Sequence, residues 1–230
     1  MNQLQTKAIV LNRTDYGEAD RIITVLTPSH GKLSLMARGV RRVQSKLAGG
    51  IELFSTAEIS YISGRGQIGT LTSARLLHYY DSIVTDIERV QLGYELIKIL
   101  HRATEDQPED EYFGLLEAAF KALDMPKIST DLIRVWFQAQ LLRYAGHSPN
   151  LKTDIEGIKL TAGHNYSFDF DQVAFTVHTE GHFSADHIKF LRLLFSGNSP
   201  ETLSHIQGIE NLIPESSPLV QTMLQTYIRI

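Results

Sequence analysis

"KLSLMARGVRRVQSKLAGG" spans residues 32–50 and holds the two features from which the fold can be inferred. Its first half alternates polar and apolar residues, as a strand with one buried face does. Its second half runs from Gly39 to Gly50 and carries two arginines and a lysine, with no acidic residue among them. The stretch therefore predicts a strand that leads into a long basic loop.

Four further strands are predicted around this loop, two on each side of it. Segments rich in Ile, Val, Leu and Thr precede it at residues 6–14 and 21–28. Residues 55–63 and 68–77 follow it, and the glycine-rich turn between them indicates a hairpin, because glycine adopts the positive φ of tight turns. Five short strands with one long connection fit a closed Greek-key barrel of the OB type, with an SH3-like barrel as the alternative.

The rest of the chain has helical periodicity, beginning at about residue 81. Apolar residues from Ile83 through Ile87, Val90 and Tyr94 predict one buried stripe. Helices are predicted over residues 81–105, 107–125, 129–147, 184–197, 199–208 and 216–230, with a short hairpin at 166–178. The predicted fold class is therefore α+β: a five-stranded OB-fold barrel at residues 1–80, followed by a mostly α-helical domain at residues 81–230.

Charge is distributed unevenly along the 230 residues, whose net charge is −4 at pH 7. The first 80 residues contain ten basic and five acidic residues, and the remainder contains 12 basic and 21 acidic residues. This asymmetry indicates a basic module that meets a polyanion. The chain has no cysteine, which excludes disulfides, thiolate zinc sites and cysteine nucleophiles. No apolar run is long enough to span a membrane and no signal peptide is evident, so we expect a cytoplasmic protein.

The basic loop is the candidate binding site, because cations on a loop can reach a nucleic-acid backbone. Aromatic side chains for base stacking are few in the barrel region, which favours contacts with phosphates over reading of bases. The alternative is a solvated surface loop whose charges only aid solubility. The predicted DNA contacts are Arg41, Arg42 and Lys46 on the loop, with Arg21, Lys32, Arg38 and Arg65 on or beside the strands.

Other functions have weaker support in the sequence. Asp15, Glu18 and Asp20 could form the carboxylate cluster of a metal-dependent nuclease, or simply a solvated turn. The chain lacks a P-loop, so ATP hydrolysis is not expected. An RNA-binding OB module also stays open. We expect no cofactor and no catalysis. Whether a metal binds the histidines of the C-terminal half is left open; these are His164, His178, His182 and His187.

An ordered series of short motifs across residues 7–74 resembles the N-terminal domain of the RecO family of bacterial recombination mediators. The series comprises "AIVL", "DYGEAD", "HGKLSLMARGVRR", "SKLAGG" and "GRG" followed by "TLTSA". A later stretch, "LLRYAGHSPNL" at residues 141–151, is similar to a helix end in the same family. Many members carry a zinc ribbon after this point. Here the resemblance implies a degenerate, cysteine-free hairpin at about residues 150–183.

The resemblance implies a non-enzymatic role in DNA repair and DNA recombination as part of the DNA damage response. The protein would bind single- and double-stranded DNA, anneal complementary strands and help load a recombinase on SSB-coated DNA together with RecR, near the nucleoid. The same seven basic residues match basic positions of the family. SSB is recognised in this family through its acidic, apolar C-terminal tail. The residues expected to hold that tail are Arg134, Leu92, Leu96 and Leu142.

Overall fold

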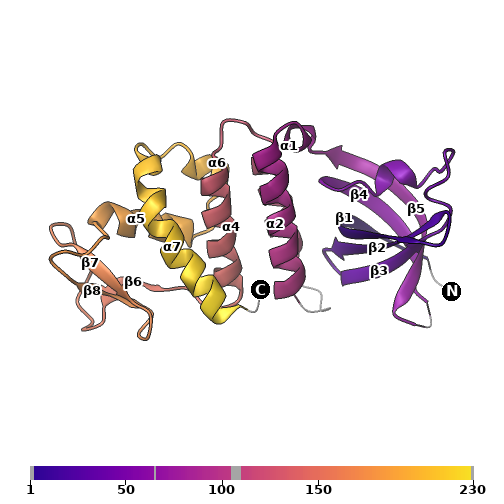
Figure 1. Ribbon diagram of the computed structural model, residues 1–230. Helices are drawn as coiled ribbons and strands as arrows, with labels where there is room; N and C mark the ends of the chain where they lie inside the picture. Colours follow the sequence, from indigo (N-terminus) through magenta and orange to yellow (C-terminus); the bar gives the residue numbers. More distant parts are fainter. Residues whose placement is uncertain (1–2, 65, 105–109, 229–230) are drawn as a thin grey trace. The chain divides into compact units, whose positions relative to one another are not determined.

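The computed structural model describes residues 3–64, 66–104 and 110–228 (Figure 1). The chain folds into two compact units, Met1–Met125 and Pro126–Ile230. Three helices that follow the barrel in sequence therefore belong to the first unit, although the composition of the sequence changes at about residue 80. Within the described ranges, we find no helix that combines the length and the apolar character needed to cross a membrane.

Five strands close into a barrel in the first unit, which confirms the predicted fold (Figure 1). Their order around the barrel is β1-β2-β3-β5-β4, and β3 pairs with β5 in parallel while the other pairs are antiparallel. Ile23, Val25 and Leu35 point inward and are fully buried. The strands are β1 (Gln3–Tyr16), β2 (Asp20–Thr27), β3 (Gly31–Ala37), β4 (Ser55–Ile62) and β5 (Ile68–Tyr79).

Helices α1 (Asp81–Val84), α2 (Ile87–Ala103) and α3 (Asp110–Leu123) complete the first unit. A single helix was predicted where α1 and α2 lie, but Asp86 separates them by accepting the N–H groups of Glu88 and Arg89. This N-cap starts a new helix at Ile87. The predicted stripe was consequently wrong in part: Ile87 is 73% exposed and Tyr94 50% exposed. The buried face of α2 holds Leu92, Leu96 and Leu100.

The second unit combines four helices with a small sheet of three strands. Helix α4 begins after Ser129, whose hydroxyl accepts the N–H of Leu132, and it ends before Gly146, which has a φ of +80°. Ser129 thus caps the first turn of α4, and Gly146 supplies the left-handed residue that follows its last turn. The elements are α4 (Thr130–Tyr144), β6 (Asn150–Asp154), β7 (Tyr166–Asp169), β8 (Ala174–Val177), α5 (Ala185–Leu194), α6 (Pro200–Leu203) and α7 (Ile209–Tyr227).

The last helix, α7, begins seven residues earlier than the sequence predicted and contains Pro214 and Pro218. Each proline removes one backbone N–H from the helical hydrogen bonds. The reason that the helix persists is its buried stripe, which continues from Ile213 through Val220 to Leu224. This stripe packs against α4, so tertiary burial outweighs the local preference of the prolines.

The sheet of the second unit lies where the degenerate hairpin was expected. Strands β7 and β8 form the predicted hairpin, and β6 pairs with β8 in parallel. Its interior is aromatic: the ring of Phe175 lies 5.0 Å from that of Phe168 and 5.4 Å from that of Phe183, both edge-on. Such contacts contribute beyond simple area burial, so they help to stabilise a hairpin of this size.

Candidate nucleic-acid interface

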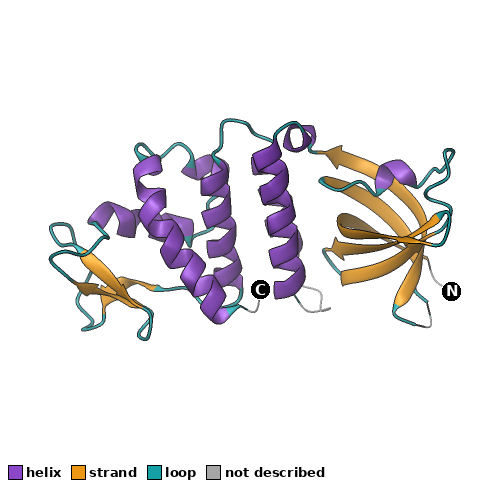
Figure 2. Ribbon diagram, in the orientation of Figure 1, coloured by secondary structure: helices purple, strands orange, loops and turns teal. Residues whose placement is uncertain are grey.

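The connection between β3 and β4 is long but well anchored (Figure 2). Val40 is 3% exposed and Ile51 is 1% exposed, so both ends of the loop are fixed in the barrel core. Leu47 and Ala48 pack against the same core, and Ala48–Gly50 forms one turn of 3-10 helix, η1. The cations between these anchors are therefore presented from a defined surface.

The acidic turn between β1 and β2 holds the start of this loop. The Asp20 carboxylate accepts the backbone N–H of Gly39 at 2.7 Å, and the N–H of Arg41 donates to the carbonyl of Ala19 at 2.9 Å. Gly39 adopts a φ of +64°, a conformation that glycine adopts without steric strain. The turn "DYGEAD" is thus more than a solvated turn, because it fixes the position of the basic loop.

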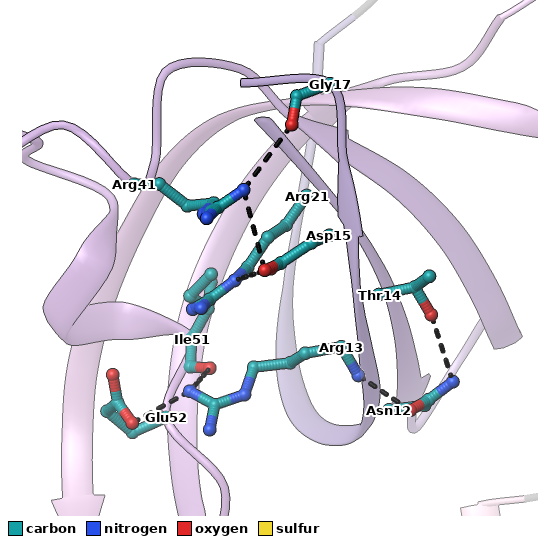
Figure 3. Close-up of polar contacts among 9 residues, drawn as sticks. All are labelled: Asn12, Arg13, Thr14, Asp15, Gly17, Arg21, Arg41, Ile51 and Glu52. Carbon is teal, nitrogen blue, oxygen red and sulfur yellow. Dashed lines mark hydrogen bonds and ion pairs between the residues drawn. The ribbon is translucent and has the colours of Figure 1, made fainter. Parts of the chain in front are cut away.

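Arg21 and Arg41 lie on either side of Asp15 (Figure 3). Arg21 Nε donates to one carboxylate oxygen at 2.7 Å, and Arg41 Nη1 lies 3.5 Å from the other. The hydrogen bond from Arg21, aided by the charges of Arg41 and Arg21, lowers the pKa of Asp15 below its ordinary value. Arg13 lies nearby and pairs with Glu52 at 2.8 Å, a contact that the sequence pattern did not reveal.

Besides Arg41, three of the predicted contacts present exposed cations: Arg38, Arg42 and Lys46. None of the three has an ion-pair or side-chain hydrogen-bond partner within the described part of the chain. Val43, between Arg42 and Lys46, is also fully exposed. These three side chains can therefore meet an incoming phosphate without first breaking an internal contact.

Lys32 has a structural role that the sequence did not indicate. Its ammonium donates to the carbonyl oxygens of His101 (3.1 Å) and Thr104 at the end of α2. A cation at a helix C-terminus can donate hydrogen bonds to the last carbonyl groups, which have no partner within the helix. It also interacts favourably with the negative end of the helix dipole. Lys32 is therefore engaged by α2 in this structure, and its contact with DNA stays a prediction. Arg65 lies outside the described residues.

Two of the three carboxylates proposed for a nuclease are engaged in structural contacts. Asp15 is paired with two arginines, and Asp20 accepts the N–H of Gly39. Across the described ranges, no group of three or more His, Asp or Glu residues is arranged to hold a metal ion. The four histidines form no such group. His187 instead caps α5, where its Nδ1 accepts the N–H of Ser184 at 3.2 Å.

The residues expected to bind the acidic tail have different surroundings. Arg134 is partly exposed on α4 and pairs with Asp131 at 3.0 Å. The expected apolar lining does not lie at a surface, because each of its leucines packs into the interior and is fully buried. These residues are Leu92, Leu96 and Leu142. Apolar periodicity placed them on helix faces correctly but could not distinguish a core from a groove.

The closed barrel with a pinned basic loop, followed by helices, defines a class: an OB-type barrel protein with a helical C-terminal part. The model of the family described as "Recombination protein O N terminal" matches residues 1–80, and the model described as "Recombination protein O C terminal" matches residues 84–230. The chain therefore belongs to the recombination protein O (RecO) family.

Curated relatives support this membership, and each is named DNA repair protein RecO. The relative from Roseiflexus sp. (strain RS-1) is 34% identical over 148 residues, which cover 64% of this chain and 51% of the relative. That from Anaeromyxobacter dehalogenans (strain 2CP-C) is 36% identical over 156 residues, covering 66% of this chain and 60% of the relative. The matched region thus spans between half and about three fifths of the length of these relatives.

Proposed function

We propose that this protein is a DNA-binding recombination mediator in DNA repair, and that the basic β3–β4 loop is its principal DNA contact. The observation that carries this proposal is the set of exposed cations Arg38, Arg42 and Lys46 on a loop pinned to the barrel. Family membership supports it, since the curated relatives are named DNA repair proteins. No bond chemistry is required of the protein in this role.

Binding to phosphates would let the protein act on single and double strands alike. Loop cations contact the backbone, which both forms share, and such contacts carry no base information. Annealing of complementary strands would follow from the same charges. Neutralising two strands lowers their repulsion, and holding both raises their effective concentration. Loading of a recombinase on SSB-coated DNA, with RecR as partner, is the mediator role that we propose for the whole protein.

Titration of labelled single-stranded DNA at several salt concentrations tests the proposal. Three to five neutralised phosphates predict that log affinity falls against log salt with a slope of roughly −2 to −3.5. The same preparation should anneal complementary strands, including strands coated with SSB. A flat salt response, or Mg²⁺-dependent cleavage of the labelled strand, would contradict the proposal. Preference for RNA over DNA of the same sequence would favour an RNA-binding module instead.

We also propose that Arg134 contributes to docking of the acidic C-terminal tail of SSB. The second unit belongs to the acidic part of the chain, so a site for an acidic peptide needs a local cation. Arg134 is partly exposed on α4, and its partner Asp131 is 70% exposed. An exposed ion pair of this kind contributes little stability, so a peptide carboxylate can replace Asp131 at low cost.

Arg134→Glu is expected to weaken binding of a labelled peptide with the SSB tail sequence at least tenfold, because it replaces attraction by repulsion. Affinity for naked DNA should stay unchanged. Lys189→Glu is the matched control: Lys189 also pairs with an aspartate three residues earlier, Asp186, at 2.9 Å. Fluorescence anisotropy with peptide and DNA measures both affinities. Equal losses in the two variants would show a general charge effect and reject a dock at Arg134.

A further inference from the structure

The Asp15 carboxylate joins two arginines from different parts of the barrel (Figure 3). Arg21 comes from β2 and Arg41 from the basic loop, and each approaches a different oxygen of Asp15. The Asp15 side chain is 53% exposed, so solvent and solutes can reach it beside Arg41 of the basic loop. The sequence suggested that Asp15 belongs to a possible metal cluster, and the structure shows a single carboxylate that bridges two guanidinium groups instead.

A carboxylate and a phosphate bind arginine in the same way. Both anions accept charge-assisted hydrogen bonds from the planar guanidinium fork. The contact with Arg41 is loose: Arg41 Nη1 lies 3.5 Å from Asp15 and 3.4 Å from the carbonyl of Gly17. Ion pairs at such exposure contribute little, so an external anion can displace the carboxylate from Arg41.

We propose that Arg21 and Arg41 form a phosphate-binding subsite and that Asp15 is its built-in competitor. The ligand class is a backbone phosphodiester, and the inference rests on the DNA binding proposed above. When a phosphate enters, the Asp15 side chain turns toward solvent and both guanidinium groups bind the phosphate. When the phosphate leaves, Asp15 restores the pairs. The competitor lowers affinity and speeds release, which suits the annealing role proposed above, because annealed strands must be released.

The Asp15 carboxylate, the proposed competitor, stays charged at neutral pH. An aspartate of ordinary pKa is already ionised at neutral pH. The hydrogen bond from Arg21 lowers the pKa of Asp15 further, so the carboxylate is charged throughout the neutral range. Asp15 could instead hold the two arginines in place for the phosphate, without competing for them. The two roles predict opposite signs for the effect of neutralising Asp15. Neutralising Asp15 raises DNA affinity if Asp15 competes with the phosphate, and lowers it if Asp15 holds the arginines in place.

Asp15→Asn keeps the shape of the side chain and removes its charge. Affinity for single-stranded DNA is expected to rise about threefold to tenfold at low salt, and the log–log salt slope to steepen by about 0.7, the value for one additional phosphate. Adding Arg21→Ala and Arg41→Ala to Asp15→Asn should abolish this gain. Fluorescence anisotropy over a range of salt concentrations measures both quantities, and thermal unfolding checks that each variant is folded.

Glu58→Gln is the matched control, because Glu58 also pairs with a barrel arginine, Arg75, at 2.8 Å. Glu58→Gln changes the net charge by the same amount as Asp15→Asn, but far from Asp15. In the register of β4 with β1, Glu58 lies opposite Lys7. Lys7 is eight residues from Asp15, which is about 26 Å measured along β1. Glu58→Gln is expected to change affinity less than twofold.

Three outcomes would overturn the inference. A lower affinity of Asp15→Asn would show that Asp15 positions the arginines, and an equal gain in Glu58→Gln would show an effect of net charge alone. In both cases the proposed function would survive, since the unaltered protein binds DNA. Absence of DNA binding by the unaltered protein would overturn the inference and the proposed function together.

Discussion

Simultaneous replacement of Arg38, Arg42 and Lys46 by alanine is expected to weaken binding of single-stranded DNA about 100-fold at about 0.1 M salt. Each lost phosphate contact removes about 0.7 from the log–log salt slope on single strands. Three contacts therefore account for a slope change of about 2, which corresponds to about two decades of affinity between 1 M and 0.1 M salt. Salt-dependent anisotropy titrations measure both the affinity and the slope.

The loss should be similar for all DNA sequences, because these cations are expected to contact phosphates and not bases. Stability should change little, since all three side chains are exposed and lack internal partners in the described part of the chain. Arg75→Ala is a suitable control, because Arg75 is an exposed barrel arginine that pairs with Glu58. If the triple variant binds DNA as well as Arg75→Ala does, the loop is not the DNA contact.

All five barrel strands could be predicted from the sequence because their signal is local. Alternation of apolar and polar residues reports which face of a strand is buried, and β3 shows it. The other strands were indicated by their content of Ile, Val, Leu and Thr. The long basic connection was also visible, because glycine and charge mark it within one short stretch. Local patterns of this kind were sufficient to identify the fold class and the three exposed loop cations.

The pairing of the cations was not predictable, because it depends on contacts between distant segments. Lys32 was grouped with the DNA contacts by its charge, yet it binds carbonyls 69 and 72 residues further along the chain. Arg41 meets Asp15 only because the loop folds back on the β1–β2 turn. Counting charges therefore identified the basic loop. It could not distinguish cations that are available to a ligand from cations already bonded within the protein.

The packing of Gly50 also depends on a contact between distant segments and could not be predicted from the sequence. The sequence places Gly50 at the border of the basic loop, and the structure shows that it lies against the backbone of β5. A Cβ at this position would lie 2.6 Å from the carbonyl carbon and the Cβ of Ala74. No flexible side chain can relieve that overlap, because the neighbour is the strand itself. Gly49, its neighbour in sequence, has no atom within 4 Å of the corresponding position.

Gly50→Ala is therefore expected to destabilise the protein by about 1–3 kcal/mol, the range for overpacking a well-packed site. For a chain of this size the melting temperature should fall by roughly 2–12 °C. Strand β5 cannot move without breaking its pairing with β4, so the loop is expected to shift outward and to carry Lys46 with it. DNA affinity should consequently fall together with stability.

Gly49→Ala provides the matched control at the adjacent position, where open space accepts the methyl group. It should leave the melting temperature unchanged or slightly raised, because alanine restricts the unfolded chain more than glycine does. Differential scanning calorimetry of the two variants, with anisotropy titrations on the same samples, measures stability and binding together. Equal melting temperatures would contradict close packing of the loop on β5. A destabilised Gly50→Ala with unchanged affinity would show that the position of η1 does not set the DNA contact.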